Sequence, residues 1–125
     1  MFDSDRPLFI QIAEQIEDAI LHGAYAEDTQ VPSTNELASF HRINPATAAK
    51  GLQMLVDKQT LYKRRGVGMF VSPGAPAAIR KERQAVFSTR FITPLIAEAR
   101  AIGLTGAELT KLVAEASATQ EEGKK

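Results

Sequence analysis

The sequence has 125 residues, enough for one compact domain with an appendage but not for two full-sized domains. Apolar residues make up 44% and charged residues 24%, as in ordinary globular proteins, and the absence of cysteine excludes disulfides and thiolate metal sites. Fifteen basic residues balance fifteen acidic ones, and no apolar run reaches the roughly 18 residues that a membrane span needs. Because the N-terminus is also too acidic for a secretory signal, we expect a cytoplasmic protein.

Charge is unevenly distributed along the chain. Residues 1–36 hold one basic residue against eight acidic ones, whereas residues 41–68 hold six basic residues against one acidic one. A protein without net charge can still attract phosphates through one basic face, although a run of charges is more often solvated surface. The elements that residues 41–68 build must distinguish these interpretations.

Residues 8–22 are predicted to form the first helix, because apolar side chains recur there at the spacing of one helix face. Pro7 suits the first turn, and Gly23 suits the end of the helix. Residues 24–32 are expected to form only a connection. The polar face of the helix is predicted to carry Gln11, Glu14, Gln15 and Asp18.

A second helix is predicted to begin at Ser33, because Ser33-Thr34-Asn35-Glu36 has the capping-box pattern. It ends near His41, and its apolar side is formed by Leu37, Ala38 and Phe40. A third helix follows after a short turn at Arg42-Ile43, with Asn44 as its N-cap and Pro45 in its first turn.

The third helix has a buried stripe formed by Ala48, Leu52, Leu55 and Val56. It therefore turns outward Ala46, Thr47, Lys50 and Gln53. Two helices joined by a short turn, the second exposing small, polar and basic residues near its start, are typical of a helix-turn-helix.

Residues 61–71 are predicted to form a β-hairpin, because strand-forming residues flank the turn Gly66-Val67-Gly68. Three basic residues stand just before this turn, Lys63, Arg64 and Arg65. A basic hairpin after a recognition helix is typical of the wing of a winged helix, which contacts phosphates or the minor groove. The alternative is that these cations protect an exposed sheet edge from aggregation.

Beyond a break at residues 73–76, residues 77–103 have a helical pattern, which Pro94 should kink or split near Ile92–Thr93. A last helix starts at Thr105 with a second capping box. The predicted fold class is mainly α with a small β-hairpin. Its parts are a winged helix-turn-helix at 1–73, a helical dimerisation region at 74–118 and a disordered tail at 119–125.

The C-terminal helices have apolar stripes but no partner domain of their own. We expect them to form a homodimer, because DNA-binding helices are generally used in symmetric pairs. A small-molecule effector pocket between the same helices is an open alternative. The residues predicted to mediate dimerisation are Phe87, Phe91, Leu95, Ile96, Leu109, Leu112 and Val113.

These residues together resemble the GntR family of bacterial regulators, and within it the short YtrA-type branch. The resemblance covers Pro7 to Val71, and about fifty residues follow it, too few for the larger effector domains of most members. It implies a dimeric repressor whose C-terminal helices pair, often acting on a transporter operon. The matching pieces are Pro7-Leu8-Phe9, Gln11-Ile12, Val31-Pro32-Ser33, Glu36-Leu37-Ala38, Ile43-Asn44-Pro45, Thr47, Leu52, Leu55 and Arg65-Gly66-Val67-Gly68-Met69-Phe70-Val71.

The chain departs from the family pattern at three positions. Asn35 stands where many members have arginine, Ala48 where a larger aliphatic residue is usual, and Thr60 where glycine is common. Asn35 can hydrogen-bond a phosphate or an adenine edge but cannot form an arginine–guanine fork. We therefore expect the operator sequence to differ from the family norm.

The resulting hypothesis is a sequence-specific regulator, a dimeric repressor that binds a roughly palindromic double-stranded DNA operator. Asn44 and Pro45 are first of all capping residues. The alternative is a winged-helix scaffold for protein interaction without specific DNA binding. The residues predicted to contact DNA are Ser33, Thr34, Asn35, Arg42, Asn44, Pro45, Ala46, Thr47, Lys50, Lys63, Arg64, Arg65, Gly66 and Gly68.

No enzymatic function is predicted, because no nucleophile–base pair, paired carboxylates or metal constellation can be placed in one cleft. The two histidines, His22 and His41, do not belong to a cluster with metal-ligand spacing. The sequence Gly66-Val67-Gly68 lacks the following helix that a nucleotide-binding loop needs. Neither a cofactor nor a metal is therefore expected.

Overall fold

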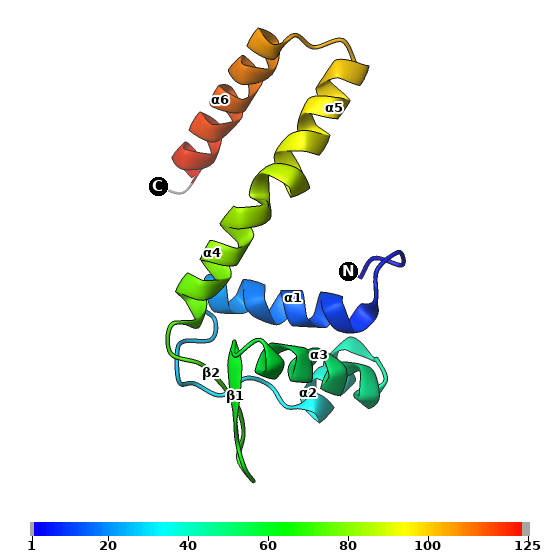
Figure 1. Cartoon of the computed structure of the whole chain (residues 1–125), viewed down its shortest axis with the longest axis vertical. Coiled ribbons are helices and arrows are strands. Elements are labelled where there is room, and N and C mark those ends of the chain that lie inside the picture. The colour runs from blue at the N-terminus through cyan, green and yellow to red at the C-terminus, as the bar shows by residue number, and fades with distance from the viewer. Residues whose placement is uncertain (1, 124–125) are drawn as a thin grey trace. The chain divides into compact units, whose positions relative to one another are not determined.

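Figure 1 shows the computed structural model of the chain, which describes residues 2–123. The chain divides into two compact units, one up to Arg83 and one from Gln84 onward. The first unit contains the helices α1 (Leu8–Leu21), α2 (Thr34–His41) and α3 (Pro45–Asp57), then the strands β1 (Leu61–Arg64) and β2 (Gly68–Val71). After these come α4 (Ala75–Phe87), the π-helical turn η1 (Ser88–Ile92), α5 (Thr93–Ala101) and α6 (Gly106–Gly123).

The core of the first unit is built where α1 packs against α3. Ile12 and Ile20 of α1 and Leu52 and Leu55 of α3 are each at most 2% exposed and belong to one apolar cluster. The two helices approach closely at Gly51, where a Cβ atom would lie 2.9 Å from the carbonyl oxygen of Phe9. This packing fixes one face of α3 against α1, while residues on the opposite face of α3 stay exposed.

The predicted starts of α2 and α3 are confirmed. The hydroxyl of Ser33 accepts a hydrogen bond from the backbone N–H of Glu36 (3.1 Å), and the Glu36 carboxylate accepts one from the N–H of Ser33 (3.0 Å). The hydrogen bond from the backbone N–H of Ser33 to the carboxylate, followed by the contribution of the Ser33 side chain, holds the pKa of Glu36 below its usual value. Asn44 caps α3 through its Oδ1 atom, which accepts from the N–H of Ala46 at 2.8 Å.

The predicted hairpin is also present, but part of the connection before α2 joins it. The strands β1 and β2 pair antiparallel from Leu61–Val71 to Arg64–Gly68. Residues 28–31, expected to be a plain connection, run along β2, where the N–H of Val31 donates to the carbonyl of Met69 at 3.0 Å. The pairing uses backbone groups over so few residues that no side-chain alternation marks it.

Gln11 corrects the predicted polar face of the first helix, because it is buried with only 7% of its surface exposed. Its amide nitrogen donates to the carbonyls of Asp3 (2.6 Å) and Arg6 (2.9 Å), and its amide oxygen accepts from the N–H of Asp3 (2.6 Å). A polar side chain can be buried when all its groups are paired in this way. Gln11 therefore fastens the N-terminal segment to α1.

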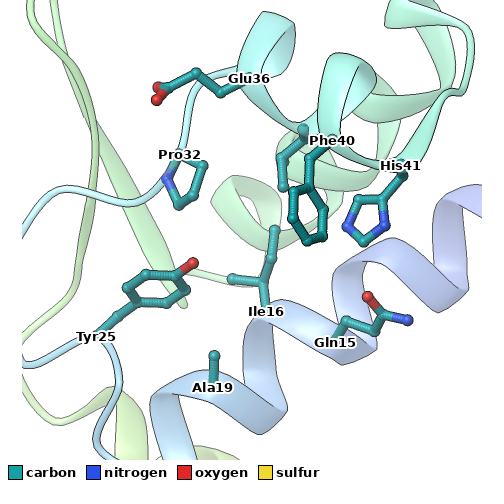
Figure 2. A pocket seen from close by; sticks show the side chains of 9 residues that line it. Gln15, Ile16, Ala19, Tyr25, Pro32, Glu36, Phe40 and His41 are labelled. Atoms are coloured by element: carbon teal, nitrogen blue, oxygen red, sulfur yellow. The ribbon is translucent and has the colours of Figure 1, made fainter.

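Phe40 is a second correction, because the predicted apolar side of α2 includes it and its side chain is 82% exposed. Successive residues of a helix lie about 100° apart, so Leu37 and Ala38 fill the narrow buried face and Phe40 falls outside it. Its ring contacts His41 edge-on, with centroids 4.9 Å apart. Figure 2 shows Phe40 and Tyr25 beside a cavity of about 450 Å³, whose lining comes from α1, α2 and the connection.

The boundary between the units falls ten residues beyond the expected break, because the first turns of α4 belong to the first unit's core. Ala75 and Ile79 are each 3% exposed and belong to its apolar cluster. The tail expected from residue 119 is helical as far as Gly123, and residues 124–125 lie outside the described part. Glutamine and glutamate make up three of the five residues 119–123, and their helix propensity is high.

The break predicted at Ile92–Thr93 coincides with the junction of η1 and α5. Pro94 lies in the first turn of α5 and has no N–H group to donate to the preceding turn, which has a π-helical form. The chain stays helical through this junction, since Ile92 and Thr93 both have right-handed helical dihedral angles. None of the helices between residues 2 and 123 is long and apolar enough to cross a membrane.

Candidate nucleic-acid interface

The start of α3 presents the predicted contact residues of the helix-turn-helix. Asn44, Pro45 and Ala46 are exposed, and Thr47 is half-buried. The cap uses only the Oδ1 atom of Asn44, so its amide N–H groups remain available to an acceptor outside the described chain. The first turn of α3 therefore combines the free side-chain amide N–H groups of Asn44 with small side chains, which permit close approach to a base edge or phosphate.

Lys50 is exposed on α3, but it lies toward α1. Its ammonium nitrogen is 4.2 Å from the centroid of the Phe9 ring, a cation–π contact. A Lys50 that bound DNA would have to leave this ring, at a cost of about 0.5–1 kcal/mol. Its predicted role in base recognition therefore has a competing contact within the protein.

Three predicted contact residues at the start of α2 lie next to the wing. Ser33, Thr34 and Asn35 line a cavity of about 240 Å³ together with Gln30, Val67 and Gly68. Ser33 is occupied by the capping box, whereas the side chain of Asn35 is exposed and has no hydrogen-bond partner within residues 2–123. The start of α2 and the turn of the wing thus line the same small cavity.

The three cations of the wing are exposed and form no ion pair with any described residue. Arg64 lies over the ring of Phe70, with its guanidinium carbon 5.1 Å from the ring centroid. Because side chains alternate along a strand, Lys63 lies on the opposite face of the hairpin from Arg64, while Arg65 follows in the turn. The wing therefore carries cations on both of its faces.

An aromatic pair links the two strands of the wing. Tyr62 and Phe70 stack with ring centroids 5.7 Å apart and an interplanar angle of 22°. The Tyr62 hydroxyl donates to Oδ1 of Asp28 at 2.8 Å, and this hydrogen bond raises the pKa of Tyr62 above its usual value. The stack joins the two strands of the wing, and the hydrogen bond connects the wing to the residues before α2.

Arg42 lies in the turn between α2 and α3 and is exposed. It adopts the left-handed conformation at the end of α2, with φ at 55°, and its N–H donates to the carbonyl of Ala38. A left-handed residue at this place ends a helix and lets the chain reverse into the next one. Gly66 supplies the corresponding conformation in the wing, with φ at 77°.

Lys58 does not belong to the interface, although it is one of the six basic residues between residues 41 and 68. Its ammonium nitrogen donates to Glu17 and to Glu82, both at 3.0 Å, and Glu17 is only 6% exposed. Partial burial lowers the pKa of Lys58, but the hydrogen bonds that Lys58 donates to Glu82 and Glu17 outweigh it and leave the pKa above its ordinary value. Glu17 is 41 residues away in sequence, so local patterns give no signal of this contact.

Replacing Lys58 should destabilise the first unit without touching the interface. We expect Lys58→Met to lower the free energy of unfolding by about 2 kcal/mol at pH 7, because Glu17 then stays buried without its cation. Urea unfolding measures this, with the exposed Lys81→Met as a control and Glu17→Gln as a second change that should recover part of the loss. Because folding raises the pKa of Lys58, this contribution is fully present below the ordinary lysine pKa and is lost only as the pH rises through the raised pKa. A Lys58→Met variant as stable as the wild type would contradict the ion pair.

The residues predicted to mediate dimerisation are apolar side chains of the second unit, and most of them are exposed. Phe87 and Phe91 are each 52% exposed, and their ring centroids are 5.5 Å apart. Leu109 is half-buried, and the remaining exposed members of the set are Leu95, Ile96, Leu112 and Val113. A separate cavity of about 320 Å³ lies between α5 and α6 and includes Ile96 and Leu109 in its lining.

Comparison with known proteins matches this arrangement to one family. The profile of the "Bacterial regulatory proteins, gntR family" matches residues 9–71, from α1 to the end of the wing. The HTH-type transcriptional repressor YtrA of Bacillus subtilis is 27% identical over 122 residues, which cover 98% of this chain and 93% of that protein. Two other relatives from the same bacterium are longer, and the chain spans only 28% and 13% of their lengths.

Solved structures give the same result. A GntR-family regulator from Bacteroides thetaiotaomicron superimposes with a TM-score of 0.70 at 29% identity, covering 90% of this chain and 98% of that one. The DNA-binding domain of AraR, solved in complex with operator ORX1, has a TM-score of 0.54 at 28% identity and covers 58% of this chain and 93% of that one. Since the family profile spans the whole helix-turn-helix and wing, the chain belongs to the GntR family of bacterial regulatory proteins, a family of regulators and not of enzymes.

Proposed function

We propose that this protein is a transcriptional regulator that binds double-stranded DNA as a homodimer and represses its target genes. The observation that carries the proposal is the pairing of an open α3 start with a wing whose three cations have no acidic partner among the described residues. Cations without an internal partner can neutralise phosphates without first breaking an ion pair. The AraR domain with the same fold was solved on operator DNA, which supports this assignment.

The start of α3 enters the major groove in the proposed complex, and the wing contacts the backbone or the minor groove. Asn44, Ala46 and Thr47 then face base edges, and Asn35 at the start of α2 contacts a phosphate or an adenine. The wing cations supply affinity that does not depend on sequence. Lys50 contributes only if it leaves Phe9, so the loss of that contact reduces its share in recognition.

Dimerisation through the second unit would place two copies of α3 on the DNA. The exposed apolar side chains of α4 to α6 support this, since a surface of this kind is normally covered in solution. A two-fold axis would set the recognition helices about one turn of DNA apart and select a roughly palindromic operator. Repression, as opposed to activation, is proposed because the relative YtrA is a repressor.

Fluorescence anisotropy on the DNA upstream of the protein's own gene tests the proposal, with a scrambled duplex as control. We expect preference for the native duplex, saturation at two chains per site, and affinity that falls by about 0.9 in log–log slope for each neutralised phosphate. Binding to neither duplex, independent of salt, would contradict the function and favour a scaffold for protein interaction. Equal, salt-dependent binding to both would contradict the choice of operator alone.

A further inference from the structure

Gln30 connects the segment before α2 to the turn of the wing. Its side-chain amide nitrogen donates to the carbonyl oxygen of Val67 at 2.9 Å, across 37 residues of sequence. The N–H of Val67 in turn donates to the carbonyl of Arg64 at 2.9 Å and closes the turn. The backbone N–H of Val67 is thus held by the hairpin itself, and its carbonyl oxygen is held by Gln30.

Gly68 makes room for this contact. A Cβ atom at position 68 would collide with the amide of Gln30, and the residue has φ at 145°, which side chains rarely allow. The glycine after the turn therefore serves two needs, the backbone conformation and the close approach of Gln30. A second side chain at this point would push the amide away from Val67.

The backbone next to Gln30 is tied to the same strand. Gln30 forms a bridge with Phe70, and the N–H of Val31 donates to the carbonyl of Met69 at 3.0 Å. Pro32 and then the N-cap Ser33 follow directly, so only two residues separate Gln30 from the capping box of α2. One short segment therefore fixes both the wing and the start of the helix-turn-helix.

We propose that Gln30 is a positioning residue of the DNA interface, which holds the turn of the wing at a fixed place relative to the start of α2. The proposal rests on the proposed function. The tip of a two-stranded hairpin is otherwise free to move, because such hairpins have little stability of their own. With its turn fixed before binding, the wing presents Lys63 and Arg65 without an ordering cost, and affinity rises accordingly.

The first test compares the unbound wild type with Gln30→Met, which keeps the side-chain length but lacks the donor. We expect faster amide hydrogen exchange and lower NMR order parameters at Gly66 and Val67, with the urea midpoint unchanged. Gln84→Met, which replaces an exposed glutamine outside the first unit, is the control. It should change neither the amide exchange nor the order parameters of Gly66 and Val67. Unchanged exchange at Val67 in Gln30→Met would overturn the proposal whether or not the protein binds DNA.

The second test measures operator affinity in a double-mutant cycle at low salt. Gln30→Met should weaken binding by about three- to tenfold, the range expected for one hydrogen bond. In a background where Lys63, Arg64 and Arg65 are all glutamine, the same change should cause no further loss, because Gln30 acts through those cations. An equal loss in both backgrounds would overturn the positioning role, since it would mean that Gln30 contacts DNA directly. Failure of the wild type to bind would instead contradict the proposed function, while the exchange result would still stand.

Discussion

Neutralising the wing is expected to produce the largest loss of DNA affinity, between about sixtyfold and five hundredfold at 0.1 M monovalent salt. The variant replaces Lys63, Arg64 and Arg65 together by glutamine. Each neutralised phosphate changes the affinity with a log–log salt slope of about 0.9, which corresponds to a factor of roughly eight at this salt concentration. Two phosphates left without their cations set the lower limit, and three set the upper one. Arg64 distinguishes these limits, because its contact with Phe70 competes with a phosphate.

The salt dependence provides a second measurement of the same effect. The slope of log affinity against log salt should become shallower by about 1.8 to 2.7 in the triple variant, in proportion to the number of phosphates that the wing neutralises in the wild type. A matched control removes three exposed cations elsewhere, with Arg80, Lys81 and Lys111 changed to glutamine. If both triple variants lose the same affinity, the net charge of the protein and not the wing would be responsible.

Replacing Gly51 should have the largest effect on stability among single changes to the interface support. We expect Gly51→Ala to lower the free energy of unfolding by about 1–3 kcal/mol, the usual cost of overpacking a core. The new Cβ atom would lie 2.9 Å from the carbonyl oxygen of Phe9 and 3.1 Å from Cγ2 of Ile12, so α1 and α3 would have to separate. Alanine favours helix over glycine by up to about 1 kcal/mol, and this gain opposes but does not cancel the loss.

Gly106→Ala is the matched control for Gly51→Ala, because a Cβ atom on Gly106 at the start of α6 meets nothing within 4 Å. It should be neutral or stabilise slightly, since only the backbone preference changes. Urea unfolding followed by circular dichroism compares the two variants directly. A Gly51→Ala protein that is as stable as the wild type would show that separating α1 and α3 costs no more than the helix preference of alanine returns.

Local sequence signals predict the elements of the first unit well. The capping box of Ser33 and Glu36 spans three residues, and the cap of Asn44 on Ala46 spans two, so each is visible in a short stretch of sequence. The hairpin is predictable for the same reason, because its turn and strands are contiguous. Contacts of this kind depend little on the rest of the fold.

The parts that sequence reasoning misses depend on residues far apart in the chain. Lys58 meets Glu17 across 41 residues, and Gln30 meets Val67 across 37. Helix periodicity also places residues on faces without showing how wide the buried face is, which is why the prediction for Phe40 is wrong. For the candidate interface, the sequence indicates which residues are outward, but not that Lys50 rests on Phe9.

The π-helical turn at Ser88–Ile92 also sets the rotational phase of the helix that follows it. Its hydrogen bonds span five residues where those of an α-helix span four, so the turn takes up one extra residue. Each residue advances an α-helix by about 100°, and α5 is rotated by about that angle relative to an uninterrupted helix. The direction in which Leu95 and Ile96 face, relative to Phe87, is therefore determined by the number of residues in this turn. A single-residue deletion there would reorient the proposed dimer surface while leaving every one of its side chains unchanged.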